Sequence, residues 1–301
     1  MSKHVVIDSI ARSGTTLLSA LLRSQEKTMA FCPGFNEPLS CLNIADWPHG
    51  VCRQEFLENA EIDLKKFKEE SLSQIVDYAQ YYGLSKDEWR SIIFDADSPE
   101  SVRENIEKAF PEVGVFCYRW NQSLFYFYQW QNKGENHLWL SMIRNPLDRA
   151  ISSFEKHKWE YEDSLRNTLA FLDKAETAKQ SNQFKTFYYE DLVENGKEEI
   201  KKIYDFFGVE LNSINLTDIK GSNGKDFIPQ SSKIKNVNEK KDGYLTDAEK
   251  FSGLYKSGID RYKTATYKLD SGKEKPLMSE ETRGVFKHYL LNSPEYGRYF
   301  K

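Results

Sequence analysis

The chain has 301 residues, of which 39% are hydrophobic and 29% are charged, a balance typical of a globular protein and not of a disordered one. Its formal net charge of −4 excludes a strong overall basic field for duplex nucleic acid, although a local basic pocket for a phosphorylated small molecule is still allowed. The apolar segment near the N-terminus is too short for a signal-peptide core, and no stretch approaches the roughly 20 apolar residues of a membrane span. We therefore expect a cytoplasmic protein without nucleic-acid or membrane partners.

The cysteines give little sign of a disulfide framework or a metal site. Cys32, Cys41, Cys52 and Cys117 form no CxxC pair, so we expect them to be reduced and structural. Cys41, His49 and Cys52 lie close enough in sequence to raise a zinc site, but they lack the paired spacing of zinc ligands. We expect no metal.

The N-terminal third is predicted to contain three strands and two helices. The apolar run at Val5 and Val6 predicts a buried strand over residues 4–10. A helix with leucines on one side is expected over 14–23, and a second strand over 29–32. Further helix and strand predictions cover about 55–82 and 91–94, respectively.

The middle of the chain continues the alternation of strands and helices. Strands are expected over 113–118, 138–143 and 184–189, and the helix after the last strand has an apolar face formed by Ile200, Ile203, Tyr204 and Phe207. This order predicts a three-layer α/β/α fold with a central parallel sheet, in a single domain over residues 1–301. Ligands of such sheets bind at the carboxyl ends of the strands.

The loop after the first predicted strand has the character of an anion site. A strand, a tight turn and a helix direct backbone N–H groups and a helix N-terminus to one point, and the arginine of the turn adds positive charge. Its residues are Arg12, Ser13, Gly14, Thr15, Thr16 and Leu17.

A nucleoside triphosphatase loop is the alternative interpretation of this segment. On the pattern G-x-x-x-x-G-K-[ST], Ser9 takes the place of the first glycine and Thr15 that of the lysine. Because that lysine reaches the β- and γ-phosphates, its absence argues against ATP or GTP hydrolysis. A nucleotide with a single phosphate unit at this position fits better.

A second candidate phosphate site follows the strand predicted over 138–143. Arg144 stands at the strand end, Pro146 suits the start of a helix, and Ser152 lies two turns into that helix. Arg144 and Ser152 could together grip a phosphate.

Together these motifs resemble the PAPS-dependent sulfotransferases (PAPS is 3′-phosphoadenosine-5′-phosphosulfate). Residues 12–17 look like the family's 5′-phosphosulfate loop, and Arg144, Pro146 and Ser152 match its 3′-phosphate motif. Residues 187–192 resemble its Y-E-D-L segment, which implies that Tyr189 lies near the adenine. The resemblance implies a P-loop-like fold with a cofactor core over about 4–210 and a C-terminal helical or lid portion over about 211–301.

The resemblance also implies in-line transfer of a sulfuryl group from PAPS, with release of PAP. Arg12 and the loop N–H groups would stabilise the departing phosphate oxygen, and the transfer demands no bridging metal. Glu37, in a Glu-Pro pair after the second strand, is the expected base, since related enzymes acting on sugars or tyrosines carry a glutamate there. His49 is the alternative, because the cytosolic branch of the family uses a histidine.

The C-terminal third departs from the family pattern. The late Arg-Lys-Gly of the cytosolic branch is absent, and the nearest substitute is Lys256, Ser257 and Gly258. Residues 220–241 are polar and without periodicity, so they are either a surface loop or a lid over a ligand.

The acceptor is the least determined part of the interpretation. The aromatic segment over 120–130 favours core packing, and part of it could line an acceptor pocket. We expect a freely diffusing small-molecule acceptor with a hydroxyl or an amine. A carbohydrate or tyrosine acceptor, a non-catalytic PAP-binding protein and a P-loop kinase are the alternatives.

Overall fold

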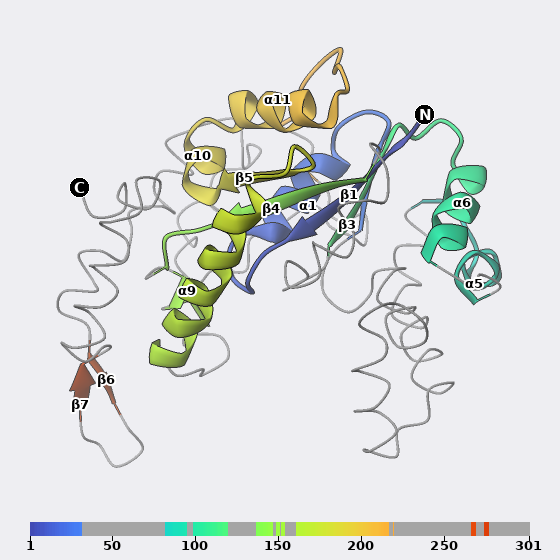
Figure 1. Cartoon of the computed structure of the whole chain (residues 1–301). Coiled ribbons are helices and arrows are strands. Elements are labelled where there is room, and N and C mark those ends of the chain that lie inside the picture. Colours follow the sequence, from blue (N-terminus) through green and yellow to red (C-terminus); the bar gives the residue numbers. More distant parts are fainter. Residues whose placement is uncertain are drawn as a thin grey trace, which may run out of the picture.

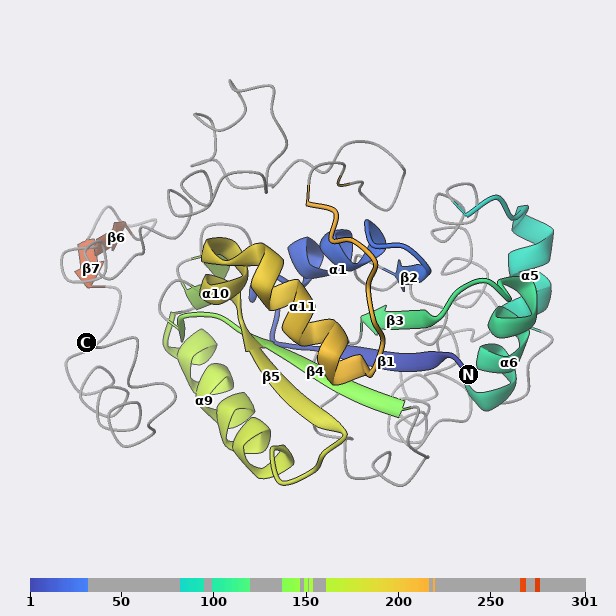
Figure 2. The ribbon, with the colours of Figure 1, turned by 90° about the horizontal axis from the view of Figure 1, so that it is seen from above.

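Five parallel strands form the central sheet of the structure, in the order β2-β3-β1-β4-β5 (Figures 1 and 2). The strands are β1 (Lys3–Asp8), β2 (Thr28–Phe31), β3 (Val115–Arg119), β4 (His137–Ile143) and β5 (Phe184–Tyr188). This computed structural model describes residues 1–31, 82–94, 99–119, 137–146, 149–150, 152–153, 161–216, 219, 266–268 and 274–276. The predicted parallel α/β sheet is confirmed.

Helices cover both faces of the sheet (Figures 1 and 2). The helices are α1 (Thr15–Arg23), α5 (Lys86–Phe94), α6 (Pro99–Ala109), α9 (Tyr161–Ala178), α10 (Tyr189–Glu194) and α11 (Gly196–Phe207). Figure 1 shows α11 above the sheet and α9 below it. A separate antiparallel pair is formed by β6 (Thr266–Lys268) and β7 (Glu274–Pro276).

The face beneath α1 and α11 is the apolar core. Side chains alternate along each strand, and every second one on β1 and β4 enters a buried cluster with the leucines of α1 and the apolar side of α11. Ile200, Ile203 and Phe207 are fully buried there, as the helical spacing predicts. Burial of these apolar side chains is the main stabilising contribution to a fold of this kind.

The strand predicted over 91–94 is wrong, because these residues form the last turn of α5. Ser85 and Glu88 form a capping box: the Glu88 N–H donates to Ser85 Oγ at 3.2 Å, and the Ser85 N–H donates to Glu88 Oε2 at 2.7 Å. Trp89 and Ile92 are buried at helical spacing, which places the apolar residues of this segment on one side of a helix. The helix begins before the short apolar run that suggested a strand.

Three other helices were not predicted from the sequence, and one predicted helix falls on residues that are not described. Neither α6, α9 nor α10 follows from the periodicity considered above, and Tyr189, predicted as the end of a strand, is the first residue of α10. The helix predicted over 55–82 lies outside the described residues, apart from Tyr82.

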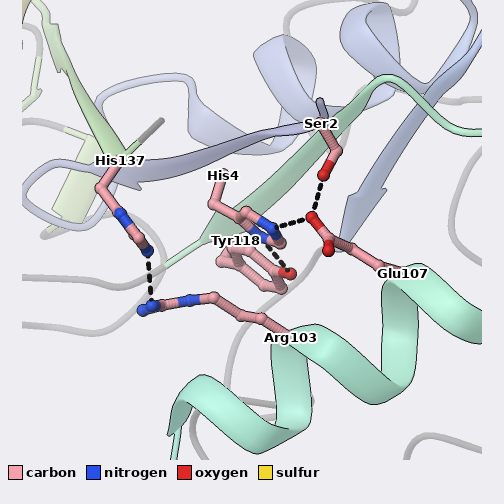
Figure 3. A network of polar contacts seen from close by, with 6 residues as sticks. All are labelled: Ser2, His4, Arg103, Glu107, Tyr118 and His137. Carbon is pink, nitrogen blue, oxygen red and sulfur yellow. Dashed lines mark hydrogen bonds and ion pairs between the residues drawn. The ribbon is translucent and has the colours of Figure 1, made fainter. Parts of the chain in front are cut away.

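A polar cluster attaches α6 to the other face of the sheet, at its amino edge. His4 of β1 contacts Tyr118 Oη through Nδ1 at 3.0 Å and Glu107 Oε1 through Nε2 at 2.8 Å. Burial, followed by the charge of Arg103, lowers the pKa of His4 to about 3, so the ring is neutral and the Glu107 contact is a hydrogen bond rather than an ion pair at neutral pH. Figure 3 shows the six residues of this cluster: Ser2, His4, Arg103, Glu107, Tyr118 and His137.

Candidate functional site

The candidate site lies where three neighbouring strands end. In the sheet, β4 is paired with β1 on one side and with β5 on the other, and all three run parallel. Their carboxyl ends therefore meet at one edge, which brings together three segments that are far apart in sequence. These are the loop over 9–14, Arg144 and Asn145, and Tyr189 and Glu190.

The first loop makes a tight turn before α1. Arg12 has φ 76° and Gly14 has φ 94°, and the Ser13 N–H donates to the Ile10 carbonyl at 3.3 Å. A positive φ costs a residue with a side chain about 1–2 kcal/mol, so the surrounding contacts must hold Arg12 in this conformation. The helix begins directly afterwards.

The N-terminus of α1 offers donors for an anion. Gly14 is its N-cap and has no side chain to cap the first turn, and no acidic residue occupies that turn. The first N–H groups of a helix have no partner within the helix, and they carry the positive end of its dipole. The backbone here therefore offers donors of the kind that an anion site needs, and the anion site itself stays a prediction.

The side chains of the loop divide between the interior and the surface. Those of Ser13 and Thr15 are buried, Thr16 is exposed, and Leu17 packs into the apolar core. Leu17 can therefore contribute to an anion site only through its backbone N–H.

A glycine is required at position 14 both by its positive φ and by the close approach of the Tyr189 ring. A Cβ at this position would lie 2.2 Å from Cδ2 of Tyr189, closer than any real contact of this kind. The guanidinium of Arg144 lies over the same ring, 4.8 Å from its centroid. Tyr189 is thus held between the first loop and Arg144; its expected contact with adenine stays a prediction.

The two phosphate motifs are in direct contact. Arg12 Nε donates to Ser152 Oγ at 3.0 Å, although the two residues are 140 positions apart. Arg144 Nη1 donates to the carbonyl of Arg12 at 3.2 Å. The residues that the sequence assigned to two phosphate groups therefore form one connected, positively charged site.

The site contains a hydrogen-bond donor that no described residue of the protein satisfies. The Nε of Arg144 is buried and has no hydrogen-bond partner among the described residues. Leaving such a group unsatisfied costs about 1–3 kcal/mol. Donors of this kind beside a helix N-terminus fit a phosphorylated ligand such as PAPS.

Two buried residues of the site were missed by the sequence interpretation. Glu190, 1% exposed, accepts a hydrogen bond from the Asn145 N–H at 2.7 Å and so ties the start of the second motif to α10. Arg149, also 1% exposed, joins the second motif to the first loop through the Ala11 carbonyl. Both contacts join residues far apart in sequence, so no local pattern indicates them.

Several predicted residues lie outside the described residues. Among the cysteines, only Cys117 is described; it is a buried free thiol whose pKa is raised by burial, as expected of a structural cysteine. The predicted residues that lie outside the described part of the chain are Glu37, His49, Lys256, Ser257, Gly258, the remaining cysteines, and the segments 120–130 and 220–241.

A cavity of about 510 Å³ lies away from this site. Its lining includes Tyr204 and Gly208 at the C-terminal end of α11, and Tyr204 contacts Thr28 at the start of β2. The cavity is therefore near the amino edge of the sheet, opposite the phosphate loop. Within the described ranges, no helix is long and apolar enough to cross a membrane.

A parallel α/β sheet with a tight turn and a helix N-terminus after its central strand is an arrangement in which many proteins bind phosphates or nucleotides. The model of the sulfotransferase family matches residues 5–213, more than half of the chain, and the chain belongs to this family. Its family membership therefore makes it an enzyme that transfers a sulfuryl group. Among curated proteins, none matches the chain.

Several solved structures are similar to this chain at low identity, and the first of them shares its fold. The sulfotransferase domain of the Synechococcus PCC 7002 olefin synthase is 16% identical, with a TM-score of 0.56, covering 97% of this chain and 96% of that one. The sulfotransferase domain of the curacin biosynthetic pathway is also 16% identical, with a TM-score of 0.48 and coverages of 95% and 96%. A retinol dehydratase in complex with androsterone and inactive cofactor PAP is 14% identical, with a TM-score of 0.37 and coverages of 96% and 80%.

Proposed function

We propose that the chain transfers a sulfuryl group from PAPS to a hydroxyl or an amine of a small-molecule acceptor and releases PAP. The observation that carries this proposal is the hydrogen bond from Arg12 to Ser152, beside the N-terminus of α1. It joins the loop expected to hold the 5′-phosphate to the motif expected to hold the 3′-phosphate. A donor with phosphates at both positions would use both halves of this site.

PAPS, when bound, supplies the activated sulfuryl group and a phosphate as the leaving group. The N–H groups at the start of α1 and the guanidinium of Arg12 bind the 5′-phosphate and stabilise the charge that develops on its oxygen. Arg144 and Ser152 bind the 3′-phosphate, and the buried Nε of Arg144 gives that arginine a donor to spare.

In the proposed transfer, the acceptor oxygen or nitrogen forms a bond to sulfur while the bond from sulfur to the phosphate oxygen breaks. The electron pair of the broken bond stays on that oxygen, and the acceptor proton passes to a base. Glu37 is the proposed base, with His49 as the alternative, from the resemblance alone. Thr15, in place of the phosphate-loop lysine, favours this transfer over a kinase reaction.

The acceptor is proposed to be a freely diffusing metabolite. A carbohydrate or a tyrosine is the second candidate, because related enzymes that act on these acceptors carry a glutamate at the place of Glu37. A protein that holds PAP without chemistry is the third.

Incubation with PAPS and a panel of phenols, alcohols, amines and sugars, followed by mass spectrometry, tests the proposal. The expected result is an acceptor that gains one sulfuryl group while PAP accumulates, and Glu37→Gln slows this turnover. Binding of PAP without product from any acceptor class would favour a binding protein. Transfer of phosphate from ATP–Mg²⁺ would favour a kinase.

A further inference from the structure

Arg149 occupies an unusual place for an arginine. It lies in the helical stretch after Pro146, where its N–H donates to the Asn145 carbonyl at 2.9 Å, and its side chain is 1% exposed. A buried guanidinium is costly unless its donors are satisfied. Its partners therefore indicate what the residue does.

The guanidinium connects three segments. Nε donates to Oγ1 of Thr168 at 2.7 Å, and Nη2 donates to the carbonyl of Ser164; both residues belong to α9. Nη1 donates to the carbonyl of Ala11, in the phosphate loop, at 3.0 Å. Arg149 thus anchors the loop to a long helix on the other side of the site.

The contact with Ala11 fixes the direction of a peptide group in the loop. In a trans peptide the C=O and the following N–H point in opposite directions, so Arg149 also sets the direction of the Arg12 N–H. Arg144 holds the next carbonyl, that of Arg12, at 3.2 Å. Both carbonyls beside the strained φ of Arg12 are therefore held by arginines.

Arg149 keeps its charge at this position. Burial, followed by repulsion from Arg144, lowers its pKa to about 10, so the guanidinium remains protonated at neutral pH. Among the described residues its acceptors are two carbonyls and a hydroxyl, all neutral, so none of these acceptors offsets its positive charge beside the loop.

We propose that Arg149 is a positioning residue that preforms the phosphate loop: by holding the Ala11 carbonyl against α9, it sets the loop backbone for a phosphate group without touching the ligand. The proposal rests on the proposed function in that it takes PAP as the ligand. Preforming the loop lowers the cost of ordering it when the ligand binds.

Two substitutions and one matched control separate positioning from stability. Arg149→Met keeps a long unbranched side chain but removes the guanidinium donors, whereas Arg149→Lys keeps the charge without the planar fork. The control is Arg23→Met: Arg23 is 6% exposed and holds the Ala30 carbonyl through Nε and Nη2 at 2.9 and 2.7 Å, at the far end of α1. Titration calorimetry with PAP and amide hydrogen exchange of residues 9–17 are measured below the melting temperature of every variant.

Arg149→Met is expected to raise the Kd for PAP by about tenfold or more, and Arg149→Lys to restore part of the loss. Amide exchange over 9–17 in the ligand-free protein is expected to be faster in Arg149→Met only. Arg23→Met is expected to lower the melting temperature with a Kd within about twofold of the unmodified chain. Equal Kd values for the two methionine variants, or unchanged exchange in Arg149→Met, would overturn the proposal.

Thr168→Val replaces Arg149→Met if that variant does not fold. It removes the acceptor of Arg149 Nε, so faster exchange over 9–17 and a smaller rise in Kd are expected, and no change in either would overturn the proposal. If the unmodified chain does not bind PAP, the proposed function is wrong, and the exchange comparison alone then decides the role of Arg149.

Discussion

Gly14→Ala is expected to destabilise the protein more than Gly208→Ala, although both glycines have a positive φ. Gly14 has φ 94°, and a Cβ there would lie 2.2 Å from Cδ2 of Tyr189. Gly208, which ends α11, has φ 68° and nothing within 4 Å of a Cβ. The two positions therefore share the cost of the backbone conformation but differ in the contact.

The difference can be worked from these contacts. A positive φ costs alanine about 1–2 kcal/mol at either position. At Gly14 the Tyr189 ring must also move, which gives up its stacking with Arg144, a contribution of about 0.5–2 kcal/mol. The expected loss in the free energy of unfolding is thus about 1.5–4 kcal/mol for Gly14→Ala and about 1–2 kcal/mol for Gly208→Ala.

Urea unfolding followed by circular dichroism measures both losses. The same substitutions are then repeated in a Tyr189→Ala background, where the ring is absent. The cost of Gly14→Ala is expected to fall by about 0.5–2 kcal/mol there, since only the cost of the backbone conformation remains, while that of Gly208→Ala stays the same. If Gly14→Ala costs the same in both backgrounds, the ring does not press against the loop and the description of the site is wrong.

Three further outcomes are expected. Arg144→Ala should weaken PAP binding by about tenfold or more, since hydrogen bonds to charged groups contribute about 1.5–3 kcal/mol, while Glu37→Ala should chiefly lower kcat; calorimetry and turnover assays that found equal effects on affinity would contradict these roles. Because the pKa of His4 falls from 6.5 to about 3 on folding, the unfolded chain binds the extra proton below pH 6.5, and stability should drop by about 2 kcal/mol between pH 7 and pH 5. This part of the pH dependence should be absent in His4→Gln, as measured by urea unfolding at each pH. Tyr204→Phe should cost about 1 kcal/mol, because Tyr204 Oη and Thr28 Oγ1 share a buried hydrogen bond of 2.5 Å; an unchanged free energy of unfolding would argue against that contact.

The parallel sheet could be predicted from the sequence because its strands are buried apolar runs. Strands with both faces covered, such as β4, read as continuous hydrophobic segments, and the loop after β1 has a pattern set by local backbone geometry. The apolar face of α11 followed from helical spacing in the same way. These features depend on neighbours in sequence.

The sequence interpretation failed where short segments were ambiguous. The run over 91–94 fits a strand or a helix equally well, and the capping box of Ser85 and Glu88 decides for the helix. This Ser-x-x-Glu capping pattern is itself a local feature of the sequence.

Other features depend on contacts between distant parts of the chain. Arg149 and Ala11 are 138 positions apart, and Glu190 and Asn145 are 45 apart, so neither contact follows from a local pattern. The ring of Tyr189 against Gly14 likewise required the adjacency of β1, β4 and β5. The sequence located the motifs, and the sheet order determined how they meet.

Calorimetric titration of the unmodified chain with PAP, with ADP as the control, tests the central claim most directly. ADP lacks the 3′-phosphate, so a site formed jointly by the first loop, Arg144 and Ser152 should bind PAP much more tightly. The preference should disappear in Arg144→Ala. Equal affinity for PAP and ADP, or tighter binding of ATP–Mg²⁺, would contradict the assignment of the two motifs to one PAPS site.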